Sequence, residues 1–232
     1  MLEIALALWE QDFPVIPLGD PFSPVPASLV AEHDGDVDKA RYAFCKKARV
    51  PWRDYQGRMP SEDDIRGWWH RWPFANPGII TGVNVVVVDG DTPGACAFLE
   101  SGVITMTPWK VHTARGAHYY FRANASLILR NSAANGLDVR GVGGYVVAAG
   151  AISGDYRPYT WEVNEAFGAH DVSDLPMLTA DDVARIYAWR GISQPSDEVG
   201  EATGEVLANL GVIQLPHDGK PAEVGSRNTK MT

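Results

Sequence analysis

The clearest feature of the hydrophobic pattern is an amphipathic segment that begins at Ser61. Ser61 and Asp64 have the spacing of a capping box, and the first turn is acidic. Apolar residues then recur at i, i+3, i+4 and i+7, namely Ile65, Trp68, Trp69 and Trp72. The pattern predicts a helix that ends near Pro73.

A different pattern follows, because the run from Asn84 to Val88 is almost entirely β-branched. Such a run is typical of a strand that is buried on both faces. A short helix with proline at its N-terminal end is expected at Pro93–Glu100. Further strands are expected over residues 110–114, 118–122, 137–140, 145–149 and 156–161.

The ends of the chain add helices. A helix is expected over residues 2–11, and after Pro14 a short strand at Val15–Leu18. Residues 19–35 contain three prolines and two glycines and are expected to form a loop, whereas residues 36–48 have a weak helical pattern. A helix at Ala180–Arg190 precedes a polar, turn-rich segment. We therefore predict an α/β (α+β) domain over residues 1–190, followed over 191–232 by a linker and the start of a truncated C-terminal helical module.

Composition indicates a folded, soluble protein, with 45% apolar and 21% charged residues in a chain of 232. No apolar run approaches the roughly 20 residues that span a bilayer, and Glu3 lies where a signal peptide carries positive charge. We expect a cytoplasmic protein without membrane contact. Cys45 and Cys96 form no CxxC pair and are expected to be small buried residues.

The net charge of −9 by itself argues against nucleic-acid binding. Residues 39–53, however, contain no acid and interleave aromatic residues with six cations, namely Lys39, Arg41, Lys46, Lys47, Arg49 and Arg53. This stripe is either a nucleic-acid contact or a solvated helix face, and the sequence leaves both readings open.

Two carboxylates, Asp89 and Asp91, end the β-branched strand. Side chains at i and i+2 of a strand point to the same face, so the two groups aim at one place. Paired carboxylates need a compensating cation, and oxygen ligands suit Mg²⁺ or Mn²⁺. The alternative is that both are ordinary turn residues.

Two later segments supply candidate partners. Arg115, Gly116 and His118 form a glycine turn that delivers a histidine to the head of an aromatic strand. Asp138 and Arg140 share one face of the next strand, so they form either part of a metal site or a simple salt bridge. For His118 the alternative is a purely structural role at the start of the strand.

The order of these pieces resembles the primase-polymerase branch of the archaeo-eukaryotic primase superfamily, found in phage and plasmid replication proteins. The resemblance covers about residues 5–162. It rests on a strand-end DxD, a Gly-x-His strand, an aspartate strand followed by GGYVV, and the upstream stretches Phe13–Pro17, Lys47–Trp52, Trp68-Trp69 and Asn76–Gly82. The family often has two prolines after GGYVV, where this chain has Ala149 and Gly150, and the chain lacks cysteines for the zinc insertion of some relatives.

The resemblance implies roles for individual residues. Asp89, Asp91 and Asp138 would bind Mg²⁺ or Mn²⁺, and His118 would contact the phosphates of the incoming nucleotide. Arg115, Lys47 and Arg140 are weaker candidates for nucleotide binding. The implied architecture is a mixed sheet, largely antiparallel, that resembles an RNA-recognition motif, joined to an N-terminal α/β subdomain, with the site in the cleft between them.

The implied reaction is template-directed nucleotidyl transfer from an NTP or dNTP to a primer 3′-hydroxyl on single-stranded DNA. The expected setting is phage or plasmid replication in a bacterial or archaeal cell, with a helicase domain or protein downstream. Two alternatives remain open at the level of sequence: a metal-dependent nuclease with the same carboxylates, and a non-catalytic DNA- or nucleotide-binding module.

Overall fold

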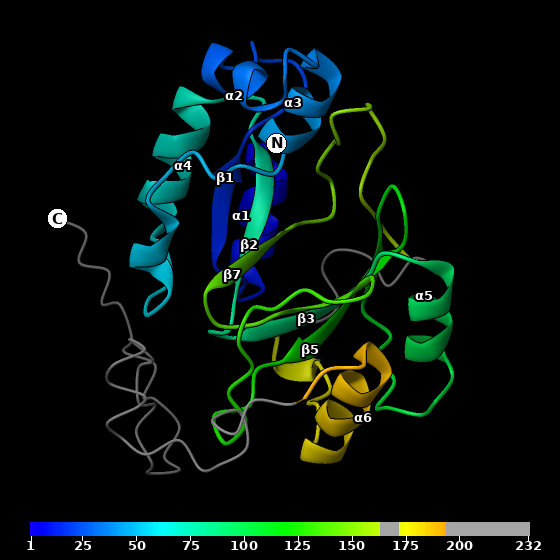
Figure 1. The fold of residues 1–232 in the computed structure, drawn as a ribbon. Coiled ribbons are helices and arrows are strands. Elements are labelled where there is room, and N and C mark those ends of the chain that lie inside the picture. The colour runs from blue at the N-terminus through cyan, green and yellow to red at the C-terminus, as the bar shows by residue number, and fades with distance from the viewer. Residues whose placement is uncertain (163–171, 194–232) are drawn as a thin grey trace, which may run out of the picture.

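Two antiparallel sheets organise the chain in a computed structural model that describes residues 1–162 and 172–193 (Figure 1). The smaller sheet has the strand order β1-β2-β7, with strands β1 (Val15–Leu18), β2 (Asn76–Thr81) and β7 (Gly144–Val147). The larger has the order β6-β3-β5-β4-β8, with strands β3 (Val85–Gly90), β4 (Lys110–His112), β5 (Ala117–Arg122), β6 (Leu137–Arg140) and β8 (Thr160–Trp161). The named strands pair antiparallel throughout the described ranges, so the sheet expected to be mixed is antiparallel in its pairing.

The helices flank these sheets. Helices α2 and α3 lie at the top of Figure 1, α4 lies beside the smaller sheet, and α5 and α6 lie by the larger one. The helices are α1 (Leu2–Glu10), α2 (Ala27–Glu32), α3 (Val37–Phe44), α4 (Glu62–Arg71), α5 (Pro93–Glu100) and α6 (Ala180–Arg190), with 3₁₀ turns at Trp52–Tyr55 and Val172–Asp174. In the part of the chain that the structure describes, no helix has the length and apolar character needed to cross a membrane.

Local sequence signals account for two of the helix starts. The predicted capping box of α4 is present, with the Ser61 side chain accepting from the Asp64 amide. Helix α6 begins with a second capping box, between Thr179 and Asp182. The Asp182 carboxylate also accepts hydrogen bonds from the amide and hydroxyl of Thr105, at 2.9 and 2.8 Å, and so joins α6 to a distant loop.

Strand β3 is buried on both faces, as its β-branched run predicted. Val86 and Val88 pack in a core that includes residues of α5 and α6, whereas Val85 and Val87 pack toward the smaller sheet and α1. Side chains alternate along a strand. Asp89 lies on the same face of the strand as Val85 and Val87, so its side chain is directed toward the smaller sheet.

The larger sheet contains a split β-α-β unit. Strands β3 and β4 both pair antiparallel with β5, so they run parallel to each other, and α5 connects them. This arrangement confirms the predicted α+β fold class.

Three local predictions differ from the structure. Residues 27–32, expected in a loop, form α2, because Leu29 is buried in a small core with residues of α3. Strand β2 was not predicted, since Pro77 and Gly78 weaken its strand pattern. The predicted strand over 156–161 is reduced to β8. The predicted linker and helical start lie, from residue 194 on, outside the described residues.

Candidate metal centre and nucleotide pocket

Three of the predicted site residues form a row across the larger sheet. Asp89 in the central strand β3 lies directly opposite His118 of β5 on one side and Asp138 of β6 on the other. Directly opposed residues in neighbouring strands share a face of the sheet. The antiparallel pairing thus brings together residues that are far apart in the sequence.

Asp91 completes a cluster of carboxylates just beyond the end of β3. One oxygen from each of Asp89, Asp91 and Asp138 lies within 4.8 Å of the other two. The Asp91 amide donates to the Gly136 carbonyl at 2.8 Å, which ties this strand end to the turn before β6. On the other side, a Cβ at Gly116 would lie 1.8 Å from the Gly90 carbonyl oxygen, so only glycine permits this close approach.

The cluster has the chemistry of a divalent-cation site. The Asp89 Oδ1 atom is buried and has no hydrogen-bond partner. Burial, followed by repulsion from Asp91 and Asp138, raises the pKa of Asp89 to about 7, although Arg140 opposes the shift. A divalent cation would relieve both the desolvation and the repulsion, and these hard oxygen ligands fit Mg²⁺ or Mn²⁺.

Two arginines border the carboxylates. Arg140 Nη2 lies 2.6 Å from Asp138 Oδ2 and 3.8 Å from Asp89 Oδ2. Arg115, whose side chain is exposed, lies 3.5 Å from Asp91 Oδ1. Asp138 and Arg140 therefore form a salt bridge, and Asp138 is at the same time a member of the cluster of three carboxylates.

A cavity of about 300 Å³ opens beside this cluster, at the lower end of the size range of small-molecule sites. Residues of both sheets and of the segment after α3 line it. They are Lys46, Trp52, Asp89, His118, Asn131, Arg140, Gly143, Gly144, Tyr145, Val146, Val147 and Tyr159. The structure thus places the pocket between the two sheets.

The lysine that lines this pocket is Lys46, whereas its neighbour Lys47 is exposed and is not part of the lining. From the sequence, Lys47 was the lysine predicted to contact the nucleotide. Both lysines follow the end of α3 at Phe44, and the path of the turn there decides which of them enters the cavity. No local sequence signal separates the two.

Tyr145 of β7 holds this turn in place, a role that was not predicted from the sequence. Its hydroxyl donates to the Lys46 carbonyl at 3.0 Å and accepts from the Ala48 amide at 3.3 Å. Its ring packs edge-on against Trp52 at 5.0 Å. The one available signal was a tyrosine between glycines and valines in the GGYVV stretch.

His118 is a buried, neutral imidazole. Burial lowers its pKa to about 3, and the positive charges of Lys46 and Arg140 act in the same direction. Its Nε2 lies 3.7 Å from Asp89 Oδ1, too far for a hydrogen bond, and its buried Nδ1 has no partner. The Nδ1 atom of His118 thus has hydrogen-bonding capacity that the described residues do not use.

The class of the protein is that of the primase-polymerase fold. It is indicated by the two sheets, the split β-α-β unit and the cluster of Asp89, Asp91 and Asp138. The family model described as bifunctional DNA primase/polymerase, N-terminal, matches residues 5–178, and the chain belongs to this family. A search of curated proteins gives no match. The resemblance seen in the sequence is confirmed, and membership implies a nucleotidyltransferase of the primase/polymerase type that acts on nucleotides and nucleic acid.

Proposed function

We propose that this protein catalyses template-directed transfer of a nucleotide from an NTP or dNTP to the 3′-hydroxyl of a DNA primer. One observation carries the proposal: Asp89, Asp91 and Asp138 converge at the edge of a pocket whose lining includes Lys46 and His118. Catalysis of this kind depends on positioning and on charge stabilisation, so no side chain has to act as a nucleophile.

Asp89, Asp91 and Asp138 would hold Mg²⁺ or Mn²⁺ in a two-metal site. When bound, the metals would activate the primer hydroxyl and offset charge on the α-phosphate and on the pyrophosphate leaving group. The protein's own groups have separate tasks. His118, as a neutral imidazole, donates an N–H to a phosphate oxygen, and Lys46 offsets negative charge on the triphosphate.

Arg140 and Arg115 have a related role at the carboxylates. Each already contacts an aspartate of the cluster, so each keeps the charge of the site low before the nucleotide arrives. Both are proposed to contact the nucleotide's phosphates as well. The exposed Lys47 is better suited to the DNA backbone than to the nucleotide.

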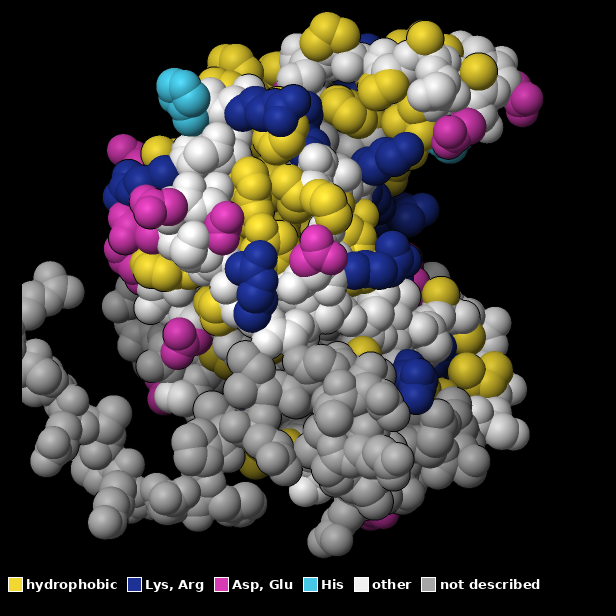
Figure 2. All heavy atoms as spheres, turned by 90° about the vertical axis from the view of Figure 1, so that its left-hand side faces the viewer, with side chains coloured by type: hydrophobic (Ala, Val, Ile, Leu, Met, Phe, Trp, Pro, Cys, Tyr) yellow, Lys and Arg dark blue, Asp and Glu magenta, His cyan; other side chains and the backbone are white. Residues whose placement is uncertain are grey.

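The proposed DNA partners are a single-stranded template and a primer. Ion pairs separate the cations of the stripe over residues 39–53 into those that have an acid partner and those that do not. Lys39, Arg41 and Arg49 are paired with acids. Within the described ranges Lys46, Lys47 and Arg53 have no such partner, which leaves them available for phosphates. Figure 2 shows a hollow at its right-hand edge, between the upper and lower parts of the molecule, with lysine and arginine side chains along it.

The wider setting follows from the same proposal. We place the protein in phage or plasmid replication in the cytoplasm of a bacterial or archaeal cell. A helicase domain or protein that opens the duplex downstream would supply the single-stranded template.

The test is primer extension by the double variant Asp89→Asn, Asp91→Asn. We expect a loss of at least about 10³-fold, because metal ions stabilise transition-state charge by several kcal/mol. Asp63→Asn, which removes an exposed acid on α4, is the matched control and should extend primers normally. Titration with Mn²⁺, followed by electron paramagnetic resonance, should show loss of binding in the double variant alone.

Three results would overturn the proposal. The first is extension by the double variant at the wild-type rate. The second is metal-dependent shortening of labelled DNA without added nucleotide and without extension, which would indicate a nuclease. The third is nucleotide binding without turnover under any metal, which would indicate a binding module.

A further inference from the structure

Three large aromatic side chains that are not part of the pocket lining form an exposed cluster. Phe22, Phe74 and Tyr156 are 56%, 59% and 55% exposed, and the Phe22 ring centroid lies 5.9 Å from that of Phe74 and 6.0 Å from that of Tyr156. They come from the loop after β1, the turn between α4 and β2, and the loop before β8. Single exposed apolar residues are ordinary, but three that touch form a patch that needs an explanation.

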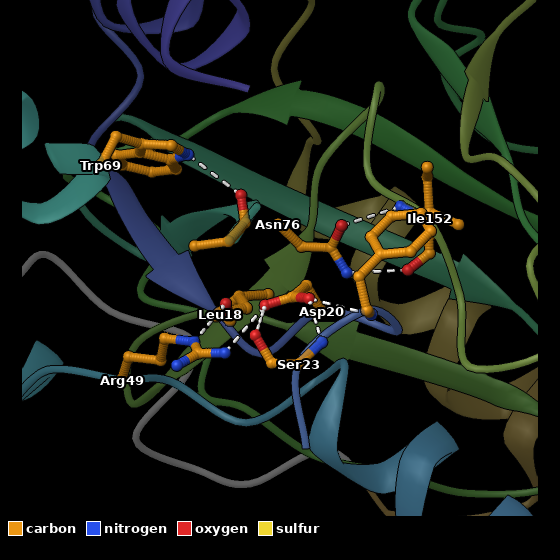
Figure 3. Close-up of polar contacts among 9 residues, drawn as sticks. Leu18, Asp20, Ser23, Arg49, Trp69, Asn76 and Ile152 are labelled. Carbon is orange, nitrogen blue, oxygen red and sulfur yellow. Dashed lines mark hydrogen bonds and ion pairs between the residues drawn. The ribbon is translucent and has the colours of Figure 1, made fainter. Parts of the chain in front are cut away.

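A buried carboxylate fixes the backbone at Phe22. Asp20, which is 1% exposed, accepts hydrogen bonds from the amides of Phe22 and Ser23 at 2.9 and 2.7 Å. Arg49 holds the same carboxylate at 2.8 Å, and Figure 3 shows the Arg49 and Ser23 side chains directed at Asp20. The first ring therefore stands on a rigid turn.

The segment that carries Tyr156 is fixed as well. The Asn76 amide side chain donates to the Ile152 carbonyl at 2.7 Å and accepts from the Ile152 amide at 2.9 Å, which joins this segment to the start of β2 (Figure 3). Tyr156 itself has a φ of 63°, a left-handed conformation that costs a tyrosine free energy. Strain that presents an aromatic ring to solvent is consistent with a binding role.

Two lysines without acid partners, Lys46 and Lys47, belong to a segment that packs against two of the loops that carry the cluster. Gly19, next to Asp20, donates its amide to the Lys47 carbonyl at 2.9 Å. Lys46 lies over the Tyr42 ring at 4.4 Å, and a Cβ at Gly154 would lie 2.4 Å from the Tyr42 Cα. Neither lysine has an ion pair in the described part of the chain.

Two acids next to the cluster, Asp20 and Asp155, are already paired with arginines. Asp20 is paired with Arg49, and Asp155 is paired with Arg157 at 2.5 Å. Exposed rings next to a segment that carries unpaired lysines are complementary to single-stranded nucleic acid, whose bases stack on aromatic side chains while lysines attract its phosphates. A purely apolar protein partner would not require the free cations.

The segment that carries Tyr156 also connects the aromatic cluster to the pocket. Arg157 Nη1 donates to the Ala114 carbonyl at 2.9 Å, one residue before Arg115, and Tyr159 lines the pocket itself. We propose that Phe22, Phe74 and Tyr156 form a platform on which unpaired bases of the single-stranded DNA template stack as the strand approaches the pocket. This inference rests on the proposed function and assigns the template a path.

The experiment measures DNA binding without catalysis. Fluorescence anisotropy in EDTA would compare a labelled oligo(dT) with an abasic strand of the same length, for the wild type and for the double variant Phe22→Ala, Tyr156→Ala. Because stacking contributes at least about 1 kcal/mol per base, we expect the variant to bind oligo(dT) at least about fivefold more weakly. Its affinity for the abasic strand should be unchanged.

Two further variants serve as controls. Met106→Ala removes a comparably exposed apolar side chain elsewhere and should leave both affinities unchanged. Tyr156→Phe keeps the stacking ring and should bind as the wild type does.

Several outcomes would refute the platform. They are unchanged oligo(dT) binding by the double variant, an equal loss for both strands, and a change of mass by light scattering without a change in DNA affinity, which would indicate a protein contact. Because binding in EDTA requires no turnover, failure here is separate from failure of the Asp89→Asn, Asp91→Asn extension test.

Discussion

Removing the Tyr145 hydroxyl tests how the pocket positions its lysine. Tyr145→Phe keeps the ring and its contact with Trp52 but leaves the Lys46 carbonyl and the Ala48 amide without their partner. Leaving such partly buried groups unpaired costs roughly 1–3 kcal/mol. We expect the free energy of unfolding in urea to fall by about this amount, without loss of the fold.

The same change should affect nucleotide binding more than chemistry. Lys46 would lose its fixed direction, and a hydrogen bond to a charged group contributes about 1.5–3 kcal/mol when it is well placed. If about half of that contribution is lost, KM for the nucleotide rises about 4- to 13-fold and kcat changes by less than twofold. Steady-state primer extension at varied nucleotide concentration measures both constants.

A second tyrosine supplies the matched control. Tyr156→Phe also removes one hydroxyl, but that hydroxyl makes only a 3.4 Å contact with the Pro21 carbonyl, so stability and KM should stay at the wild-type values. The reasoning would be refuted if Tyr145→Phe lowered stability and left KM unchanged, since the hydroxyl would then be purely structural. A fall in kcat at constant KM would refute it equally.

Three further predictions concern the pocket, a helix cap and a glycine. Lys46→Met should raise KM for the nucleotide about tenfold or more, whereas Lys47→Met should leave it near the wild-type value; equal effects in steady-state kinetics would contradict the assignment of Lys46. Burial alone would raise the pKa of Asp182, but hydrogen bonds from two threonines outweigh it and hold that pKa below its ordinary value of 3.8. A lowered carboxyl pKa stabilises the fold above the unfolded-state pKa and loses this contribution as pH falls through the folded-state pKa. Asp182→Asn should therefore cost about 1–2 kcal/mol at pH 7, with a smaller difference from the wild type below pH 4; urea unfolding that gives a constant difference across pH would exclude this account. Gly116→Ala should destabilise the protein by about 2 kcal/mol or more, because its Cβ would overlap a backbone carbonyl, whereas Gly67→Ala in the open middle of α4 should stabilise it by about 0.5–1 kcal/mol; thermal unfolding that ranks the two variants in the opposite order would contradict the geometry.

Local patterns in the sequence determined the elements whose signals are complete within a few residues. The capping box and apolar spacing predicted α4, and the β-branched run predicted β3 with both faces buried. The alternation of that strand already directed Asp89 and Asp91 to one place. The order of the motifs pointed to the family that the comparison with family models confirmed.

Tertiary structure alone decided how distant segments combine. Strand β7 pairs with β2 in the smaller sheet, although it directly follows the strand that carries Asp138. This pairing brings Tyr145 into the same cavity as Asp89 and within hydrogen-bond distance of the Lys46 carbonyl. Neighbouring lysines have the same local pattern, so only this long-range contact separates Lys46 from Lys47.

The aromatic cluster shows the same division. Nothing in the local sequence distinguishes Phe22, Phe74 or Tyr156 from other surface residues, and only folding places the Phe22 ring about 6 Å from each of the other two. Sequence patterns report the period of one helix or strand, whereas strand partners and loop paths depend on cores that form between segments more than fifty residues apart. The sequence by itself therefore determined helix α4, the buried strand β3 and the family, and the tertiary structure decided which side chains meet at the pocket and in the aromatic cluster.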